Sequence, residues 1–373
     1  MSTITAAPLA TQQRLLCGPG PTNVDPAVLD AMRAPMLGHL DPDFHEVLLE
    51  VVALLREVYR ADDGLVLAIQ ATGTSGMEAG IANLVQPGET MIVASAGYFG
   101  QRISEIALRY GVNVVEVTAD WGECVPNERL LETLARHPQA RMLAVVHAET
   151  STGVEHPLAE LGTALRGTDT LLMADCVTSL AGVVLNVGGW GVDYAYSCTQ
   201  KCLAAPPGMS PVAVSGRALE RIAARTSPVP FSLDLELLRR YWIERPPTYH
   251  HTAPILNIYA LREALSQVLE EGLHARIERH DYAGRYLQRQ LRDRGLDLIA
   301  DPAHQLAPLT AVRVPDGLDG KEIQTRLLRE HGIEVGGGLG PAAPPMWRVG
   351  LMGANASVET ADRVLAGFDA VLG

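Results

Sequence analysis

One lysine stands out in a chain that otherwise uses arginine for its positive charges. Only two of the thirty lysines and arginines are lysines, Lys201 and Lys321. Lys321 follows a turn-rich run at 316–320 and is expected to open an exposed helix. Lys201 follows an apolar run and precedes Pro206-Pro207-Gly208, where a chain would leave a sheet and turn. Because only a free amine forms a Schiff base, Lys201 is a candidate nucleophile; the alternative is a chance survivor of an arginine-biased composition.

A glycine- and hydroxyl-rich segment, residues 71–78, follows another apolar run and is expected to open a helix over 78–84. Its glycines let backbone amides converge on an anion, and the helix N-terminus adds positive potential. The segment has neither a Gly-Lys-Ser/Thr motif nor a GxGxxG fingerprint, so a single phosphate fits better than a dinucleotide. Ordinary helix capping by the same hydroxyls is the alternative.

Asp175 comes at the end of the apolar run 171–174. An unpaired carboxylate buried there would cost several kcal/mol, so it should have a partner. A pyridinium nitrogen would be such a partner. The alternative is a side chain that caps the following turn.

Three weaker signals accompany these residues. Tyr98-Phe99-Gly100 offers an aromatic face for stacking on a ring, although aromatic side chains are more often part of a core. The segment 149–153 offers hydroxyls after an apolar run. Arg348 lies in the otherwise apolar segment 347–350, where a half-buried guanidinium would bind a carboxylate or phosphate, or would form an ion pair within the protein.

The elements that must position these residues form a regular alternation. Apolar runs separated by helical or turn-rich segments predict seven strands, at 65–69, 91–94, 112–117, 142–146, 171–174, 192–196 and 211–214. An amphipathic helix is expected from Asp43 to about Arg60. The alternation predicts an α/β fold with a mostly parallel seven-stranded sheet, whose ligands lie beyond the carboxyl ends of the strands.

A different pattern begins near Pro254. Long helices are expected at about 255–271 and 275–294, then strands at 310–314, 333–335 and 347–351, and a last helix from Val358. We therefore predict an N-terminal arm (1–20), a large domain (21–254) and a smaller C-terminal α/β domain (255–373).

Composition excludes several classes of protein. A net charge of −13 argues against a nucleic-acid partner, and no apolar stretch is long and charge-free enough to span a membrane. The first thirteen residues do not resemble a signal peptide, and the C-terminus carries no peroxisomal signal. An odd number of cysteines without a CxxC pair or clustered ligands predicts a reduced, cytoplasmic protein without a metal site; they are Cys17, Cys124, Cys176, Cys198 and Cys202.

These segments together resemble the class V (fold-type I) aminotransferases, which use pyridoxal 5′-phosphate, and within them the alanine–glyoxylate and serine–glyoxylate aminotransferases. The resemblance runs from about Leu15 to about Asp369. Its most specific motifs are Gly18-Pro19-Gly20-Pro21, Glu149-Thr150-Ser151-Thr152-Gly153, Gln200-Lys201 with Ala205-Pro206-Pro207-Gly208, Tyr249-His250-His251-Thr252, and Gly337-Gly338-Leu339-Gly340 with Arg348-Val349-Gly350.

The resemblance implies that Lys201 carries the cofactor and that Asp175 keeps its ring nitrogen protonated. The other positions implied for the cofactor are Gly73, Thr74 and Gln200 at the phosphate, Val177 and Phe99 on the two ring faces, and Thr150 at the ring hydroxyl. Arg348 would bind the substrate α-carboxylate, with Gly20 also in the substrate site. Tyr249 and Thr252 would reach the phosphate of the neighbouring subunit of a homodimer. Thr74 and Phe99 replace the histidine and tryptophan of some relatives.

The implied function is transfer of an amino group from alanine or serine to glyoxylate or pyruvate. An unusual donor in a biosynthetic pathway remains open. A lyase or desulfurase on the same fold is an alternative, but cysteine desulfurases use a cysteine in the second domain, and no cysteine follows Cys202. A non-catalytic regulator is the third alternative; it leaves Lys201, Asp175 and Arg348 unexplained.

Overall fold

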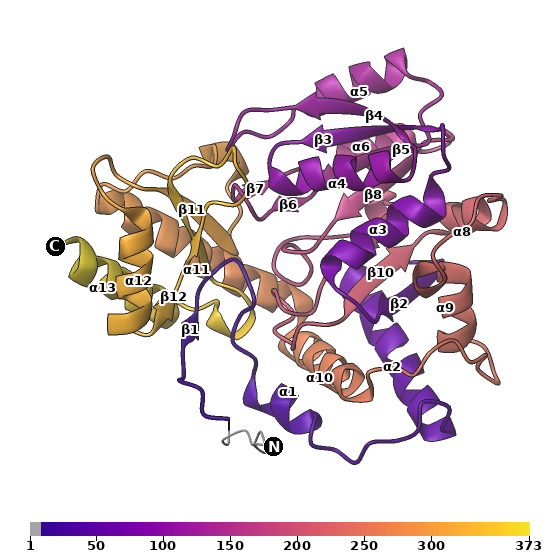
Figure 1. The fold of residues 1–373 in the computed structure, drawn as a ribbon, viewed down its shortest axis with the longest axis horizontal. Helices are drawn as coiled ribbons and strands as arrows, with labels where there is room; N and C mark the ends of the chain where they lie inside the picture. Colours follow the sequence, from indigo (N-terminus) through magenta and orange to yellow (C-terminus); the bar gives the residue numbers. More distant parts are fainter. Residues whose placement is uncertain (1–8) are drawn as a thin grey trace, which may run out of the picture.

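A seven-stranded sheet forms the centre of the larger part of the computed structural model, which describes residues 9–373 (Figure 1). From edge to edge its strands are β2 (Leu65–Ile69), β10 (Ser210–Val214), β9 (Tyr194–Tyr196), β8 (Leu171–Asp175), β5 (Met142–Val146), β3 (Thr90–Ser95) and β4 (Asn113–Thr118). β10 is antiparallel to both of its neighbours, and the other neighbouring pairs are parallel. The predicted fold class is confirmed, and each of the seven predicted strands overlaps one of these.

The strands are apolar on both faces because helices cover both sides of the sheet. Every residue of the strands other than β4 is buried, whereas β4, at one edge, is largely exposed. The helices of this part are α1 (Pro26–Ala31), α2 (Pro42–Tyr59), α3 (Gly73–Leu84), α4 (Tyr98–Arg109), α5 (Asn127–Arg136), α6 (Ala159–Leu165), α7 (Val187–Trp190), α8 (Gly216–Ala223), α9 (Leu235–Trp242) and α10 (Ile255–Glu271). A two-stranded ribbon of β6 (Ala148–Glu149) and β7 (Val154–Glu155) follows β5.

The amphipathic helix expected from Asp43 is α2. The side chain of Asp41 caps its N-terminus, Pro42 occupies the first turn, and Arg60 ends the helix in a left-handed conformation. Its apolar face packs on β2 and on α10, which also contacts α1. The domain boundary at 254/255 stays a prediction; α10, which follows it, belongs to the same hydrophobic core as the large sheet.

A second core lies in the C-terminal part of the chain, coloured orange to yellow in Figure 1. Helices α11 (Leu273–Asp293), α12 (Gly320–Glu330) and α13 (Val358–Leu372) pack around an antiparallel sheet of β11 (Leu309–Arg313), β14 (Met346–Gly350) and β13 (Gly336–Gly337). The three-stranded sheet carries Arg348 at its centre, where it pairs with Ala311 and Gly336.

The structure corrects two details of the predicted elements. Helix α3 begins at Gly73 rather than Glu78, because the side chain of Thr72 caps it and the small residues that follow continue the helix. The segment Leu15–Leu16, expected to be an arm without an element, is strand β1, and it pairs with β12 (Ile333–Glu334). Residues 1–8 of the predicted arm lie outside the described residues. Within 9–373, no helix is long and apolar enough to cross a membrane.

Candidate active site

Lys201 lies five residues beyond the carboxyl end of β9, and its side chain is almost fully buried. Its Nζ donates to the carbonyl oxygen of Pro19. Gly20 adopts a φ of +103°, and a Cβ at that position would lie 2.8 Å from Nζ, so a side chain there would collide with the amine. Burial, with the nearby charge of Arg348, lowers the pKa of the Lys201 amine. This environment favours a neutral amine.

Asp175 is the last residue of β8 and is 2% exposed. Its Oδ1 accepts from the backbone N–H of Val177 at 2.9 Å, and its Oδ2 accepts from the Tyr196 hydroxyl at 2.7 Å. Burial raises the pKa of this carboxyl to about 7, although both hydrogen bonds and the charge of Lys201 act in the opposite direction. A cationic partner would restore the carboxylate to its ordinary ionised state.

Tyr196 is a site residue that the sequence reasoning did not identify. It lies opposite Asp175 in the pairing of β8 with β9, so the hydrogen bond joins two adjacent strands. A polar residue at the end of a strand was the signal that selected Asp175, and Tyr196 ends its own strand in the same way. The register between the two strands brings the side chains of Asp175 and Tyr196 together, and this register cannot be deduced from the sequence.

Arg348 projects from β14 of the C-terminal part and is 6% exposed. Its Nε donates to the carbonyl of Gly337 at 2.7 Å and its Nη1 to the carbonyl of Thr150 at 3.2 Å. Burial lowers the pKa of the guanidinium to about 10, and Glu149 opposes that shift. The guanidinium is thus held by neutral carbonyls rather than by a bidentate carboxylate, which leaves it able to bind an anion.

Glu149 connects several of these groups and was noted only as part of a motif. Its Oε2 accepts from the backbone N–H groups of Phe99 and Gly100 at 3.2 and 3.3 Å, and its Oε1 accepts from the backbone N–H and the hydroxyl of Ser151 at 2.9 and 2.6 Å. Burial raises its pKa. The carboxylate therefore fixes the first turn of α4, which carries Phe99.

The first turn of α3 brings Gly73 close to the end of β8. A Cβ at position 73 would lie 3.1 Å from Cγ2 of Val177, so the helix approaches this segment closely. The carbonyl of Thr150 accepts from Arg348, and the hydroxyl groups of Thr150 and Thr178 share a hydrogen bond of 2.5 Å. These contacts gather nine of the residues proposed from the sequence around Lys201; they are Gly20, Gly73, Phe99, Thr150, Asp175, Val177, Gln200, Lys201 and Arg348.

The residues present fit pyridoxal phosphate. Asp175 is a deeply buried carboxyl that lacks a cationic hydrogen-bond partner, as a protonated ring nitrogen would be. Gln200, next to Lys201, has a buried Oε1 without a partner in the described range 9–373, and a half-turn of this amide would present its NH₂ group instead. The backbone N–H groups of Gly73 and Thr74, which have no hydrogen-bond partner among residues 9–373, add donors suited to a phosphate.

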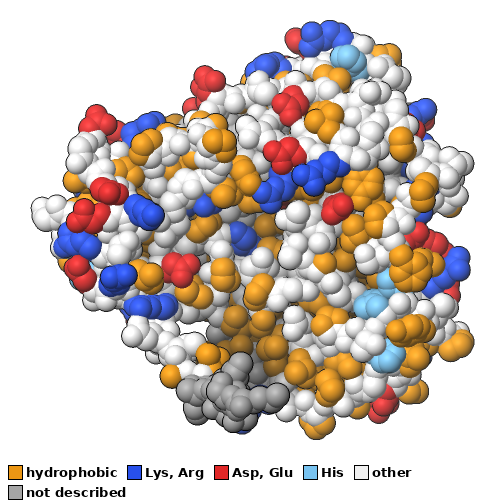
Figure 2. Space-filling view, in the orientation of Figure 1, with side chains coloured by type: hydrophobic (Ala, Val, Ile, Leu, Met, Phe, Trp, Pro, Cys, Tyr) orange, Lys and Arg blue, Asp and Glu red, His pale blue; other side chains and the backbone are white. Residues whose placement is uncertain are grey.

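Among residues 9–373, three residues proposed from the sequence make no side-chain hydrogen bond to this cluster. The side chain of Thr74 is exposed. Tyr249 is also exposed and its ring contacts His39, with 5.4 Å between the ring centroids. Within residues 9–373, neither Tyr249 nor Thr252 makes a side-chain hydrogen bond to the cluster around Lys201. Histidines and apolar side chains share this region, at the lower right of the face in Figure 2.

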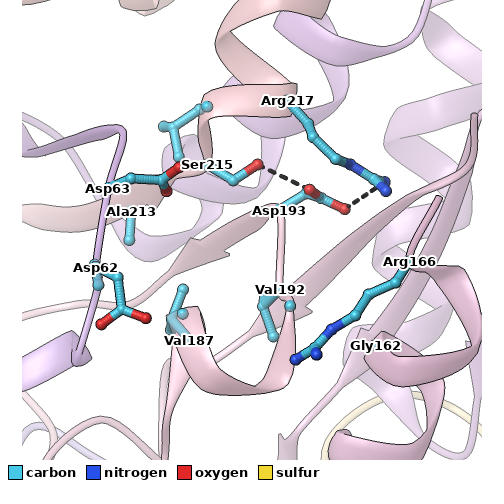
Figure 3. A pocket seen from close by; sticks show the side chains of 15 residues that line it. Asp62, Asp63, Gly162, Arg166, Val187, Val192, Asp193, Ala213, Ser215 and Arg217 are labelled. Atoms are coloured by element: carbon cyan, nitrogen blue, oxygen red, sulfur yellow. Dashed lines mark hydrogen bonds and ion pairs between the residues drawn. The ribbon is translucent and has the colours of Figure 1, made fainter.

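A separate cavity of about 180 Å³ lies at the opposite ends of the strands, beside the residues that precede β2 and β9 and follow β10 (Figure 3). Asp193, which precedes β9, accepts there from the Ser215 hydroxyl at 2.8 Å and from Arg217 at 3.0 Å. This carboxylate already has a cationic partner, in contrast to Asp175. The site chemistry therefore belongs to the carboxyl ends of the strands.

Comparisons with known proteins agree over nearly the whole chain. The model of the family "Aminotransferase class-V" matches residues 15–359. The (S)-ureidoglycine–glyoxylate transaminase of Bacillus subtilis is 36% identical, over 98% of this chain and 92% of that protein. The alanine–glyoxylate aminotransferase of Oryctolagus cuniculus is 37% identical, over 96% and 92%. A crystal structure of alanine–glyoxylate aminotransferase from Nostoc sp. superimposes with a TM-score of 0.96 at 46% identity, over 99% and 98%.

The match extends from β1 into α13 and so includes every residue of the cluster around Lys201. The predicted cofactor is supported by the same relationship. The chain belongs to the class V aminotransferase family, and its cofactor is pyridoxal 5′-phosphate.

Proposed function

We propose that this enzyme transfers the amino group of a small amino acid, alanine or serine, to a small 2-oxoacid, glyoxylate or pyruvate. The observation that carries the proposal is the cluster itself. Three buried groups lie close together: the Lys201 amine, the Asp175 carboxyl and the Arg348 guanidinium. Among residues 9–373, Asp175 has no cationic hydrogen-bond partner and Arg348 no carboxylate partner. The charges of Asp175 and Arg348 both affect the pKa of Lys201.

Each of the three residues has a distinct part in this proposal. Pyridoxal phosphate, when bound, supplies an aldehyde and an electron-withdrawing ring. Arg348 binds the α-carboxylate of the donor and so orients the bond between Cα and its hydrogen. The amine of Lys201, whose pKa its surroundings lower, accepts the Cα proton of the donor and in the second half of the reaction supplies the Cα proton of the amino-acid product. Asp175 holds a proton on the ring nitrogen, which matches a carboxyl that needs a cation.

The remaining positions are assigned from the resemblance to the family, and their locations are compatible with these roles. Gly73 and the α3 N-terminus, with Thr74 and Gln200, bind the phosphate, and Phe99 and Val177 cover the two faces of the ring. Thr150 lies near the ring hydroxyl, and Gly20 keeps space beside the amine. Glu149 holds the turn that carries Phe99.

The names of the relatives guide the choice of substrates. Glyoxylate occurs in the names of both the alanine–glyoxylate and the ureidoglycine–glyoxylate enzymes, which supports it as the acceptor. The two names differ in the donor. Ureidoglycine is therefore the main competitor of alanine and serine.

The test is a donor panel assayed with glyoxylate and with pyruvate. Alanine, serine and (S)-ureidoglycine are each supplied to the purified, cofactor-loaded enzyme with glyoxylate, and serine and (S)-ureidoglycine also with pyruvate. Formation of glycine from glyoxylate, or of alanine from pyruvate, is measured. Conversion with alanine or serine supports the proposal, whereas conversion with ureidoglycine alone would replace the donor. Sulfide release from cysteine without any transamination would favour the desulfurase alternative, although no cysteine follows Cys202.

We further propose that the enzyme is a cytoplasmic homodimer in which Tyr249 and Thr252 reach the phosphate site of the neighbouring subunit. The exposure of Tyr249, 59%, supports a role outside its own subunit. Other large apolar side chains are also exposed in the segments nearby; they are Leu29, Met36, Leu40 and Phe231. Sedimentation at micromolar concentration tests the oligomeric state.

A further inference from the structure

The turn that follows Lys201 contains a strained residue. Ala204 has a φ of +55°, in the left-handed region that side chains disfavour. Two backbone hydrogen bonds close the turn, from Ala204 N–H to the Lys201 carbonyl and from Ala205 N–H to the Thr199 carbonyl, each 2.9 Å. An alanine stays in this conformation only where the surroundings hold it there.

Arg276 of α11 makes a charged hydrogen bond to this turn. Its Nη2 donates to the carbonyl of Cys202, the residue after Lys201, at 2.7 Å. Its Nη1 donates to Glu271 at 2.7 Å. The side chain is 6% exposed, and burial lowers the pKa of the guanidinium. A cation is costly to bury, so its placement on a single backbone carbonyl, with one carboxylate for balance, calls for a reason.

A second residue of α11 acts on the same region from one helical turn further on. Nε2 of His280 accepts from the backbone N–H of Gly353 at 3.0 Å, and its Nδ1 donates to the carbonyl of Arg276 at 2.8 Å. Gly353 in turn packs on Ala204, since a Cβ at position 353 would lie 2.4 Å from the Ala204 Cβ. One face of α11 therefore holds the Lys201 turn directly and through Gly353.

We propose that Arg276 is a positioning residue, which holds the turn at Cys202–Ala204 and thereby keeps the amine of Lys201 buried beside Pro19 and Gly20. This role rests on the proposed function for the part that concerns turnover. The state of the Lys201 amine is a property of the cofactor-free protein, so this part of the proposal does not depend on the proposed function. Arginine suits this place because two nitrogens of one planar group contact two acceptors in different directions.

The sequence offers a direct assay, because it contains only two lysines. The cofactor-free protein is labelled with trace acetic anhydride at a series of pH values, and the acetylation of each lysine is measured by mass spectrometry. Lys321, exposed at the start of α12, is the internal reference. In the wild type the midpoint for Lys201 lies below the ordinary value for a lysine side chain, since burial lowers its pKa.

In Arg276→Gln, the freed turn admits water to the amine, so the Lys201 midpoint shifts upward from its wild-type value. The loaded variant loses about tenfold or more in kcat, the equivalent of one hydrogen bond to a charged group, with a smaller change in the KM of the donor. Arg285→Gln is the matched control. Arg285 lies on the same helix and pairs with Asp281, away from the turn, and this variant keeps the wild-type midpoint and kcat.

Arg276→Lys preserves the charge but replaces the fork by a single ammonium group, and it also raises the Lys201 midpoint. A wild-type midpoint in Arg276→Lys would overturn the proposal, whether or not Arg276→Gln folds. Equal shifts in Arg276→Gln and Arg285→Gln would overturn it as well. Failure of the wild type to transaminate any donor would refute the proposed function and leave the labelling result standing.

Discussion

Replacing Asp175 by asparagine should stabilise the cofactor-free protein while it abolishes the chemistry. Asp175 is deeply buried, and burial raises its pKa from 3.8 to about 7. Asparagine has almost the same shape, and its amide can accept from the Val177 N–H and donate to the Tyr196 oxygen. The substitution therefore removes the titrating carboxyl and keeps the hydrogen bonds with Val177 and Tyr196.

The sign and the size of the effect follow from the two pKa values. Between about pH 4 and pH 7 the folded protein retains a proton on Asp175 that the unfolded chain has released, so the wild type loses stability as the pH rises through this window. Above that window the loss levels off at about 4 kcal/mol, which corresponds to the difference between 3.8 and about 7. Asp175→Asn should then exceed the wild type by up to about 4 kcal/mol near pH 8, and by less than half of that near pH 5.

Urea unfolding of both cofactor-free proteins at pH 5 and pH 8 measures this difference. Asp193→Asn is the control, because Asp193 is buried but paired with Arg217, and its loss leaves that cation without its carboxylate. Because burial also raises the pKa of Asp193 while Arg217 opposes that shift, any gain of the control near pH 8 should be smaller than that of Asp175→Asn. An Asp175→Asn protein that is no more stable than the wild type, or a gain that does not depend on pH, would refute the reasoning.

Three further predictions concern the loaded enzyme. Lys201→Ala should lose the visible absorption of the bound cofactor and lower kcat by orders of magnitude; an unchanged spectrum would exclude Lys201 as the attachment site. Arg348→Gln should lower kcat/KM by about 10- to 100-fold, as expected for a lost hydrogen-bonded charge, with most of the effect on the KM of the donor; equal kinetics would remove Arg348 from the substrate site. Mixing inactive Lys201→Ala and Tyr249→Ala subunits should restore one intact site per mixed dimer, and a mixture that stays inactive would contradict a shared site.

The central sheet was predictable because its strands are apolar on both faces and separated by turn-forming residues. Such runs do not depend on distant contacts, so each predicted strand coincides with an observed one. The short elements were less accessible. The pairing of Leu15–Leu16 with Ile333–Glu334 joins two-residue strands more than 300 positions apart, and a two-residue segment has no periodicity of its own. The start of α3 was placed too late because its first turn consists of Gly, Thr and Ser, which favour loops.

The site was predictable where a residue type was unusual for its place. Lys201, Asp175 and Arg348 each interrupt an apolar pattern, and the structure brings them together. Tyr196 and Arg276 could not be predicted as functional residues, because a tyrosine in a strand and an arginine on an amphipathic helix are common. What gives them significance is a contact with a residue 21 or 74 positions away. Only the tertiary structure provides such contacts.

The segment from Leu15 to Gly20 crosses between the two hydrophobic cores. Its first residues extend the edge of β12 in the C-terminal part, and a few positions later the Pro19 carbonyl receives the hydrogen of the Lys201 amine. A rotation of the C-terminal part would therefore move this segment and, with it, the Pro19 carbonyl oxygen that accepts from the Lys201 amine. The placement of the C-terminal part thus affects the surroundings of the Lys201 amine through fewer than ten residues of chain.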